Sequence, residues 1–129
     1  MTVENLWGEI PSVEKEKSPI VILKEQASLL GQMTNNILTA QVVSRTKGTD
    51  SIDAVLDIIV PALDFYRLSI LETNFDIIKT YPLKVRNLTT GKSYEVKNEQ
   101  DFKDILRNEL SSNSVQKVLG SLLMHAKSA

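Results

Sequence analysis

The longest apolar run of the chain, residues 51–73, constrains its fold more than any other stretch. Its sequence is SIDAVLDIIVPALDFYRLSILET, with Pro61 near the middle. Residues 51–60 fit both a helix and a strand, because their apolar positions satisfy the 3.6-residue and the two-residue repeat alike. The β-branched residues just before Pro61, and the proline itself, favour a strand. Apolar and polar residues alternate again beyond the proline, so we expect two strands joined by a turn at residues 61–64.

One helix and one further strand are predicted before this run. Ser18 and Pro19 are typical of a helix start, with serine as the N-cap and proline in the first turn. The apolar stripe that follows them ends near Met33. Residues 37–45 alternate between apolar and polar side chains and predict a strand. The polar loop at residues 46–50 then turns this strand back into the central run as a hairpin.

A second, shorter hairpin is predicted after the run. Its strands are residues 83–86 and 93–96, and its turn uses the backbone freedom of Gly91. The register of this hairpin stays open. A loop of even length would place Arg86 opposite Glu95, whereas a three-residue loop with a bulge would not.

A linker and two helices complete the chain. Residues 74–80 have the composition of a linker with some apolar anchoring. Asn98 is a suitable N-cap for the first helix, which the polar residues 111–114 interrupt. The second helix begins at Val115 and has the clearest helical periodicity in the chain.

These elements predict an α+β fold, with an antiparallel meander sheet of about five strands on which an N-terminal helix and two C-terminal helices pack. Residues 1–19 are expected to form an extended arm and residues 20–129 a single domain, long enough for a core without disulfides. A sheet wrapped by helices can also enclose an apolar cavity. The final helix or a sheet edge leaves a symmetric homodimer open.

The residue inventory argues against most cofactor and metal chemistry. The chain has no cysteine and a single histidine, His125, so a cysteine-based or multi-histidine metal site is excluded. We expect His125 to be exposed near a helix C-terminus. No nucleotide-binding glycine motif occurs, so we expect no cofactor and no metal. The lack of cysteine, of an apolar run of membrane-spanning length and of a signal-peptide pattern predicts a cytoplasmic protein.

Two sets of polar residues are candidates for acid–base chemistry. Asp53 and Asp57 share one face of the predicted strand but lie roughly 13 Å apart at about 3.3 Å per residue. This exceeds the separation of about 5 to 10 Å between the carboxylates of glycosidases, so we expect both on a solvated outer face. Asp64, Tyr66 and Arg67 would serve a small enzyme only if they converged in a cleft.

Charge is distributed unevenly along the chain. Residues 50–76 carry a net charge of −5 and residues 79–97 one of +4. The simplest account pairs opposite charges across the exposed face of neighbouring strands. Lys84, Arg86 and Lys92 form the candidate basic patch. The overall net charge of −1 and the lack of a nucleic-acid-binding signature argue against a nucleic-acid partner.

The N-terminal arm contains the only tryptophan of the chain, within the segment LWGEIP. Leu6, Trp7 and Ile10 are apolar residues in an otherwise polar setting. One interpretation is that Trp7 docks the arm onto its own domain. The other is that the three residues anchor another chain, since aromatic residues are enriched at binding hot spots.

The sequence leaves three classes of function. The missing catalytic groups favour a small non-catalytic interaction or accessory protein of the cytosol, whose partner is another protein or a second copy of itself, and not a membrane. The alternative is a binder of a small apolar ligand, with a cavity lined by Leu56, Ile58, Leu68 and helix residues. A small enzyme is the third class.

Overall fold

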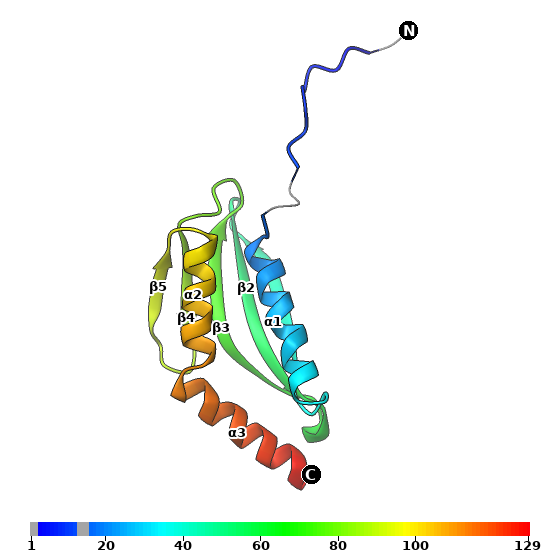
Figure 1. The fold of residues 1–129 in the computed structure, drawn as a ribbon, viewed down its shortest axis with the longest axis vertical. Helices are drawn as coiled ribbons and strands as arrows, with labels where there is room; N and C mark the ends of the chain where they lie inside the picture. Colours follow the sequence, from blue (N-terminus) through cyan, green and yellow to red (C-terminus); the bar gives the residue numbers. More distant parts are fainter. Residues whose placement is uncertain (1–2, 13–15) are drawn as a thin grey trace.

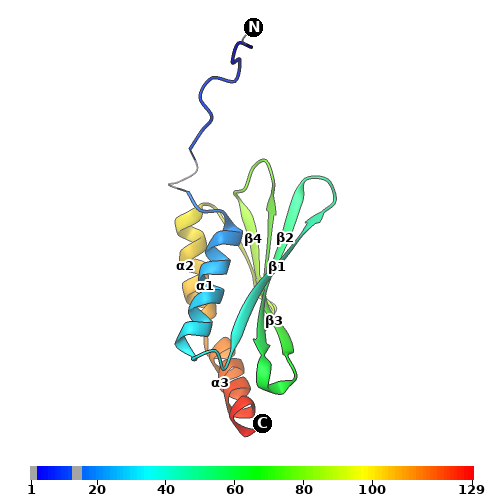
Figure 2. The same cartoon turned by 90° about the vertical axis from the view of Figure 1, so that its right-hand side faces the viewer.

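The computed structural model describes residues 3–12 and 16–129, and within them it has three α-helices and five strands. The elements in chain order are α1 (Pro19–Met33), β1 (Thr39–Lys47), β2 (Ser51–Val60), the short 3-10 helix η1 (Pro61–Leu63), β3 (Tyr66–Asp76), β4 (Leu83–Asn87), β5 (Ser93–Val96), α2 (Glu99–Leu110) and α3 (Asn113–Ser128). The strands pair in the order β1-β2-β3-β4-β5, each antiparallel to the next. The helices lie on one face of the sheet (Figure 1, Figure 2), and the predicted α+β meander is confirmed.

The central run forms the hairpin β2–β3 at the middle of the sheet. Side chains of β2 at alternate positions, Ala54, Leu56, Ile58 and Val60, are buried on the helix face, so the strand interpretation is confirmed. The turn begins with Pro61 in η1. Asp64 and Phe65 then take positive φ angles of 57° and 58°, which completes the reversal.

One expectation about a strand end is wrong, and the register of the second hairpin, which the sequence left open, is resolved. β3 continues to Asp76, into the segment expected to be a linker, because β2 is long enough to pair Ile52 with Phe75. In the second hairpin, the Asn87 N–H donates to the Lys92 carbonyl at 2.9 Å across an even-numbered loop. This register sets Lys84 opposite Glu95, and Arg86 faces Ser93 instead.

Each of the α-helices α1, α2 and α3 begins at a side-chain cap. The Ser18 hydroxyl accepts from the Val21 N–H at 3.2 Å, and the Asn98 side chain accepts from the Asp101 N–H at 2.8 Å, as the sequence predicts. The polar break between α2 and α3 supplies the third cap, Ser112. α3 therefore starts in a new direction and crosses the end of the sheet, where it contacts η1 (Figure 1).

Residues 3–12, the described outer part of the N-terminal arm, lie away from the domain (Figure 1). The arm's exit is held by Lys17, whose N–H donates to the Glu99 carboxylate at 2.9 Å and whose Nζ lies 2.7 Å from the Glu25 carboxylate. In the described part of the chain, no helix has both the length and the apolar character that crossing a membrane requires.

Candidate binding groove

An apolar groove opens between α1 on one side and α2 with the start of α3 on the other. α1 packs beside β1, and α2 packs beside β5, so the middle of the sheet lies between the two helices (Figure 1). The space is about 460 Å³. Its floor consists of sheet residues, namely Ala40, Leu56, Ile58 and Ile70.

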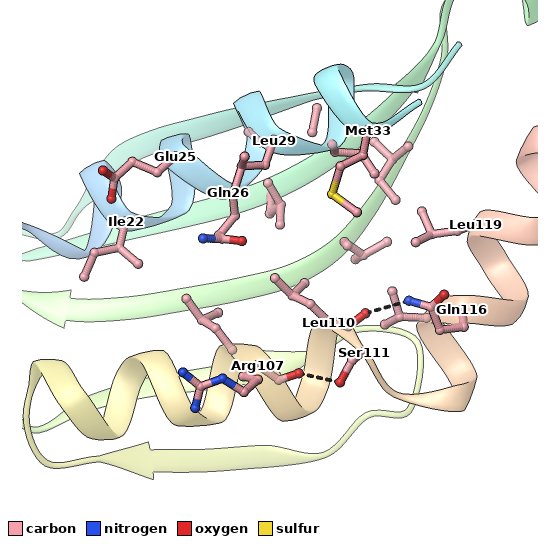
Figure 3. Close-up of a pocket in the computed structure, with 18 of the residues that line it drawn as sticks. Ile22, Glu25, Gln26, Leu29, Met33, Arg107, Leu110, Ser111, Gln116 and Leu119 are labelled. Carbon is pink, nitrogen blue, oxygen red and sulfur yellow. Dashed lines mark hydrogen bonds between the residues drawn. The ribbon is translucent and has the colours of Figure 1, made fainter. Parts of the chain in front are cut away.

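The walls of the groove are also apolar and face each other across it. α1 contributes Ile22, Leu29, Leu30 and Met33; the opposite wall consists of Leu106, Leu110, Val115 and Leu119. Figure 3 shows Met33 of α1 across the space from Leu110 and Leu119. Met33 is 79% exposed and Leu29 is 43% exposed, so part of one wall remains open to solvent. An exposed methionine can adapt its shape to a bound apolar surface.

The rim of the groove carries polar and charged side chains. Lys103 and Arg107 project from α2, and both pair with carboxylates of the same helix: Lys103 lies 3.5 Å from Glu99, and Arg107 lies 3.0 Å from Asp104. Gln116 of α3 donates to the Leu110 carbonyl at 3.3 Å (Figure 3). An apolar floor with a small number of polar groups at the rim is typical of binding sites.

The sequence located this site only in part. Leu56 and Ile58 line the groove as expected for a cavity between sheet and helices, but Leu68 does not. Leu68 stands opposite Ile58 on the same face of the sheet, but it lies nearer the β2–β3 turn than Ile70, which a β-bulge leaves unpaired between Ser69 and Leu71. Ile70 is buried and forms the floor where Leu68 was expected.

The opposite face of the sheet contains Asp53 and Asp57, and the expectation that they are solvated is wrong. They are 4% and 5% exposed. Asp57 accepts from the Ser69 hydroxyl at 2.5 Å and from the Arg67 guanidinium at 3.3 Å. Asp53 accepts from the Asn74 side chain at 2.6 Å. Each carboxylate thus has its own partners on β3, and the two do not form a catalytic pair.

The basic hairpin does not neutralise these aspartates, contrary to expectation. Asp53 instead pairs with Lys47 of β1, whose Nζ lies 4.0 Å from its carboxylate. Lys84 and Arg86 lie farther across the sheet, where Arg86 stands opposite Glu72 of β3. Opposite charges therefore face each other between adjacent strands across the sheet, but the basic residues of β4 stand opposite Glu72 of β3 and Glu95 of β5, not opposite the aspartates of β2.

The candidate basic patch is only partly assembled. Lys84 and Arg86 line a second pocket of about 430 Å³ on the outer face together with Lys47, but so do the carboxylates of Asp53 and Glu72. Lys92, at the end of the hairpin turn, does not line it. The mixed charge of this pocket gives no concentrated cationic surface.

The polar residues considered for catalysis do not converge. Asp64, Tyr66 and Arg67 line neither of the two pockets, and Arg67 is engaged by Asp57 and Gln41. His125 is exposed in the last turn of α3, as expected. Within residues 3–12 and 16–129, no cluster of three or more potential ligand side chains is placed to hold a metal ion.

The arm presents its apolar side chains to solvent. Leu6 and Trp7 are each 85% exposed and Ile10 is 74% exposed, so Trp7 does not dock onto its own domain in this structure. At the arm's exit, the hydrogen bond from the Lys17 N–H lowers the pKa of Glu99, and the Lys103 ammonium acts in the same direction.

Comparison of the chain with protein-family models, with curated proteins and with solved structures finds no match in any of the three. The geometry of the groove therefore carries the functional argument.

Proposed function

We propose that this protein is a non-catalytic binding protein of the cytosol that holds an apolar segment of a polypeptide in the groove between α1 and the α2–α3 corner. The observation that carries the proposal is the groove itself: a space of about 460 Å³ with an apolar floor and two apolar walls. A surface of this kind binds the apolar side of an amphipathic helix in many recognition domains.

The open wall supports a polypeptide as the ligand. Leu29 and Met33 are partly exposed beside the groove, so a ligand longer than the pocket would cover additional apolar surface on α1. The rim groups Lys103 and Arg107 favour a segment that carries carboxylates beside its apolar residues.

A small apolar ligand is the second candidate, and the size of the groove favours it. A volume of about 460 Å³ lies within the range of about 300 to 1,000 Å³ that is usual for small-molecule sites. The deepest floor residues, such as Leu56 and Ile58, are almost completely buried and would contact an acyl chain or a ring system.

Two probes distinguish these candidates. One is a dye-labelled synthetic amphipathic helix with leucines at i, i+3, i+4 and i+7 and glutamates on its other face. The other is a fluorescent fatty acid. Each is titrated against the full chain at low protein concentration, and fluorescence anisotropy reports binding. We expect the peptide to bind, whereas selective binding of the fatty acid would favour the second candidate.

Leu119→Glu tests the location of the site. It places a carboxylate on the α3 wall, and we expect it to weaken peptide binding about thirtyfold, the effect of losing a hot-spot contact. Ile78→Glu is the matched control, because Ile78 is exposed and lies outside the groove. If neither probe binds the wild type, or if both variants bind equally, the proposed function is wrong. Circular dichroism confirms that both variants remain folded.

A further inference from the structure

We propose that the polypeptide segment held in the groove is the N-terminal arm of a second copy of this chain, and that two copies exchange their arms reciprocally. This inference rests on the proposed function, since it requires that the groove binds a polypeptide. The partner segment is residues 4–10, in which Leu6 and Trp7 lie between Glu4 and Glu9, and Ile10 follows Glu9.

The arm has a local structure that presents its apolar residues together. The Trp7 N–H donates to the Asn5 side-chain oxygen at 2.9 Å, and the Asn5 amide donates to the Gly8 carbonyl at 3.3 Å. Gly8 takes a φ of +71°, a conformation that glycine adopts without strain. This small turn projects Leu6 and Trp7 into solvent before any partner is bound, which lowers the entropy cost of docking.

Charge on the arm complements charge on the rim of the groove. Residues 3–12 contain Glu4 and Glu9 and no basic residue. The groove offers Lys103 and Arg107, whose side chains are 41% and 70% exposed, beside one lining carboxylate, Glu25, which is already paired with Lys17. Their present partners lie on the same helix, and exposed pairs of this kind contribute little to stability. Both cations are therefore available to carboxylates that arrive with an apolar segment.

The position of residues 3–12 favours a second copy over the arm's own groove. Lys17 is held by two contacts, to Glu99 of α2 and to Glu25 of α1, and residues 3–12 lie away from the helices (Figure 1, Figure 2). Leu6, Trp7 and Ile10 are exposed and do not line the groove of their own chain. A second copy supplies a groove for these three side chains.

Reciprocal exchange closes a two-fold dimer. Each copy offers one arm and one groove, so two copies related by a two-fold axis form two identical contacts and leave none unsatisfied. Once the first arm is bound, the second binds at a high effective concentration. The dimer is therefore expected to be more stable than a single arm–groove contact would allow.

The single tryptophan makes the proposal directly measurable, since Trp7 fluorescence reports on the arm alone. Emission spectra and acrylamide quenching of the full chain are recorded over a series of protein concentrations, beside sedimentation equilibrium for mass. We expect exposed emission and a monomer mass at low concentration. At high concentration the emission should shift to the blue and quenching should fall, in step with a dimer mass.

A mixing experiment shows that the contact forms between chains. The full-length variant Leu119→Glu has a defective groove but an intact arm with Trp7. The full-length triple variant Leu6→Ser, Trp7→Ser, Ile10→Ser has a defective arm but an intact groove. Neither should dimerise alone, whereas their mixture should form a dimer in which the emission of Trp7 shifts to the blue. Success of the mixture shows that both variants are folded.

A charge-reversal cycle tests the rim. Lys103→Glu with Arg107→Glu, and separately Glu4→Lys with Glu9→Lys, should each weaken the dimer by about tenfold or more, and their combination should recover most of this loss. Lys84→Glu, on the other face of the sheet, is the control and should leave the dimer unchanged.

Three results would overturn the proposal, each in a distinct way. A blue-shifted emission at monomer mass would mean that the arm fills its own groove. Exposed emission at every concentration would mean that the arm is no ligand, even if the synthetic peptide still binds and the proposed function holds. A dimer that forms equally well with Leu119→Glu would use another surface.

Discussion

Asp57 stands out among individual residues, because a charged side chain is almost completely buried on the face of the sheet that no helix covers. The Ser69 hydroxyl and the Arg67 guanidinium hold its two oxygens, and Arg67 in turn donates to Gln41 at 3.0 Å. The network therefore joins β1, β2 and β3. A buried carboxylate is tolerated when it is paired and hydrogen-bonded in this way.

Replacing Asp57 tests the energetic weight of this network. Asp57→Ala should lower the free energy of unfolding by about 2 kcal/mol, since hydrogen bonds to charged groups contribute about 1.5 to 3 kcal/mol and Arg67 stays partly solvated. Asp57→Asn should lose less, because it keeps an acceptor for Ser69. Urea denaturation measures both. Glu95→Ala, an exposed carboxylate on the same face, is the control, and an equal loss there would contradict the role assigned to Asp57.

At the scale of elements, Glu99 joins two segments that are distant in sequence. It lies in the first turn of α2, where a helix dipole favours a carboxylate. It also accepts the N–H of Lys17, at the junction between the arm and α1. One side chain thus fixes the relative position of the two helix starts.

This contact predicts a pH dependence. The hydrogen bond from Lys17 lowers the pKa of Glu99 below its ordinary value of 4.5. The stabilisation is therefore fully present above pH 4.5 and is lost as the pH falls through the lower pKa of the folded state. We expect the melting temperature of the wild type to fall more steeply than that of Glu99→Gln below this pH. Parallel curves for the two proteins would show that the contact does not contribute.

The elements themselves follow from local sequence to a large extent. Ser18 and Asn98 mark helix starts through capping chemistry, and the β-branched residues before Pro61 mark β2, because these signals act within a few residues. The end of β3 escaped the same reasoning. Phe75 belongs to the sheet only because Ile52 lies opposite it, and pairing between strands is invisible to a local pattern.

At the scale of the whole molecule, the groove results from the spacing of the helices, which no local pattern contains. The sequence indicated that helices cover the sheet. It did not indicate that α1 and α2 lie near opposite edges of the same face, α1 beside β1 and α2 beside β5. One bulge at Ile70 shifts the register of β3, so Ile70 and Leu71 are both buried, and Asp57 is buried beside Ser69 of the same strand. The sequence therefore predicted that a cavity could lie between the sheet and the helices, but only some of the residues that line it.

If the groove is unfilled space, the same substitution should act differently at its wall and in the core. Ala27 of α1 lines the groove, whereas Ala54 of β2 is buried outside it. Ala27→Leu adds apolar contacts in open space and should leave the free energy of unfolding unchanged or raise it by about 1 kcal/mol, as cavity-filling substitutions do. Ala54→Leu overpacks the core and should cost about 1 to 3 kcal/mol.

The binding assay makes this pair of variants decisive, because stability and function should separate. Ala27→Leu fills part of the groove, so it should lower the affinity for the synthetic peptide by about tenfold, while the protein remains as stable as the wild type. Urea denaturation and anisotropy titration on the same samples measure the two effects. A large loss of stability in Ala27→Leu would show that the wall is already packed, since added side-chain volume destabilises only where no space is left for it. The groove would then be too closed in solution to hold a polypeptide, and the binding function that depends on it would fail with it.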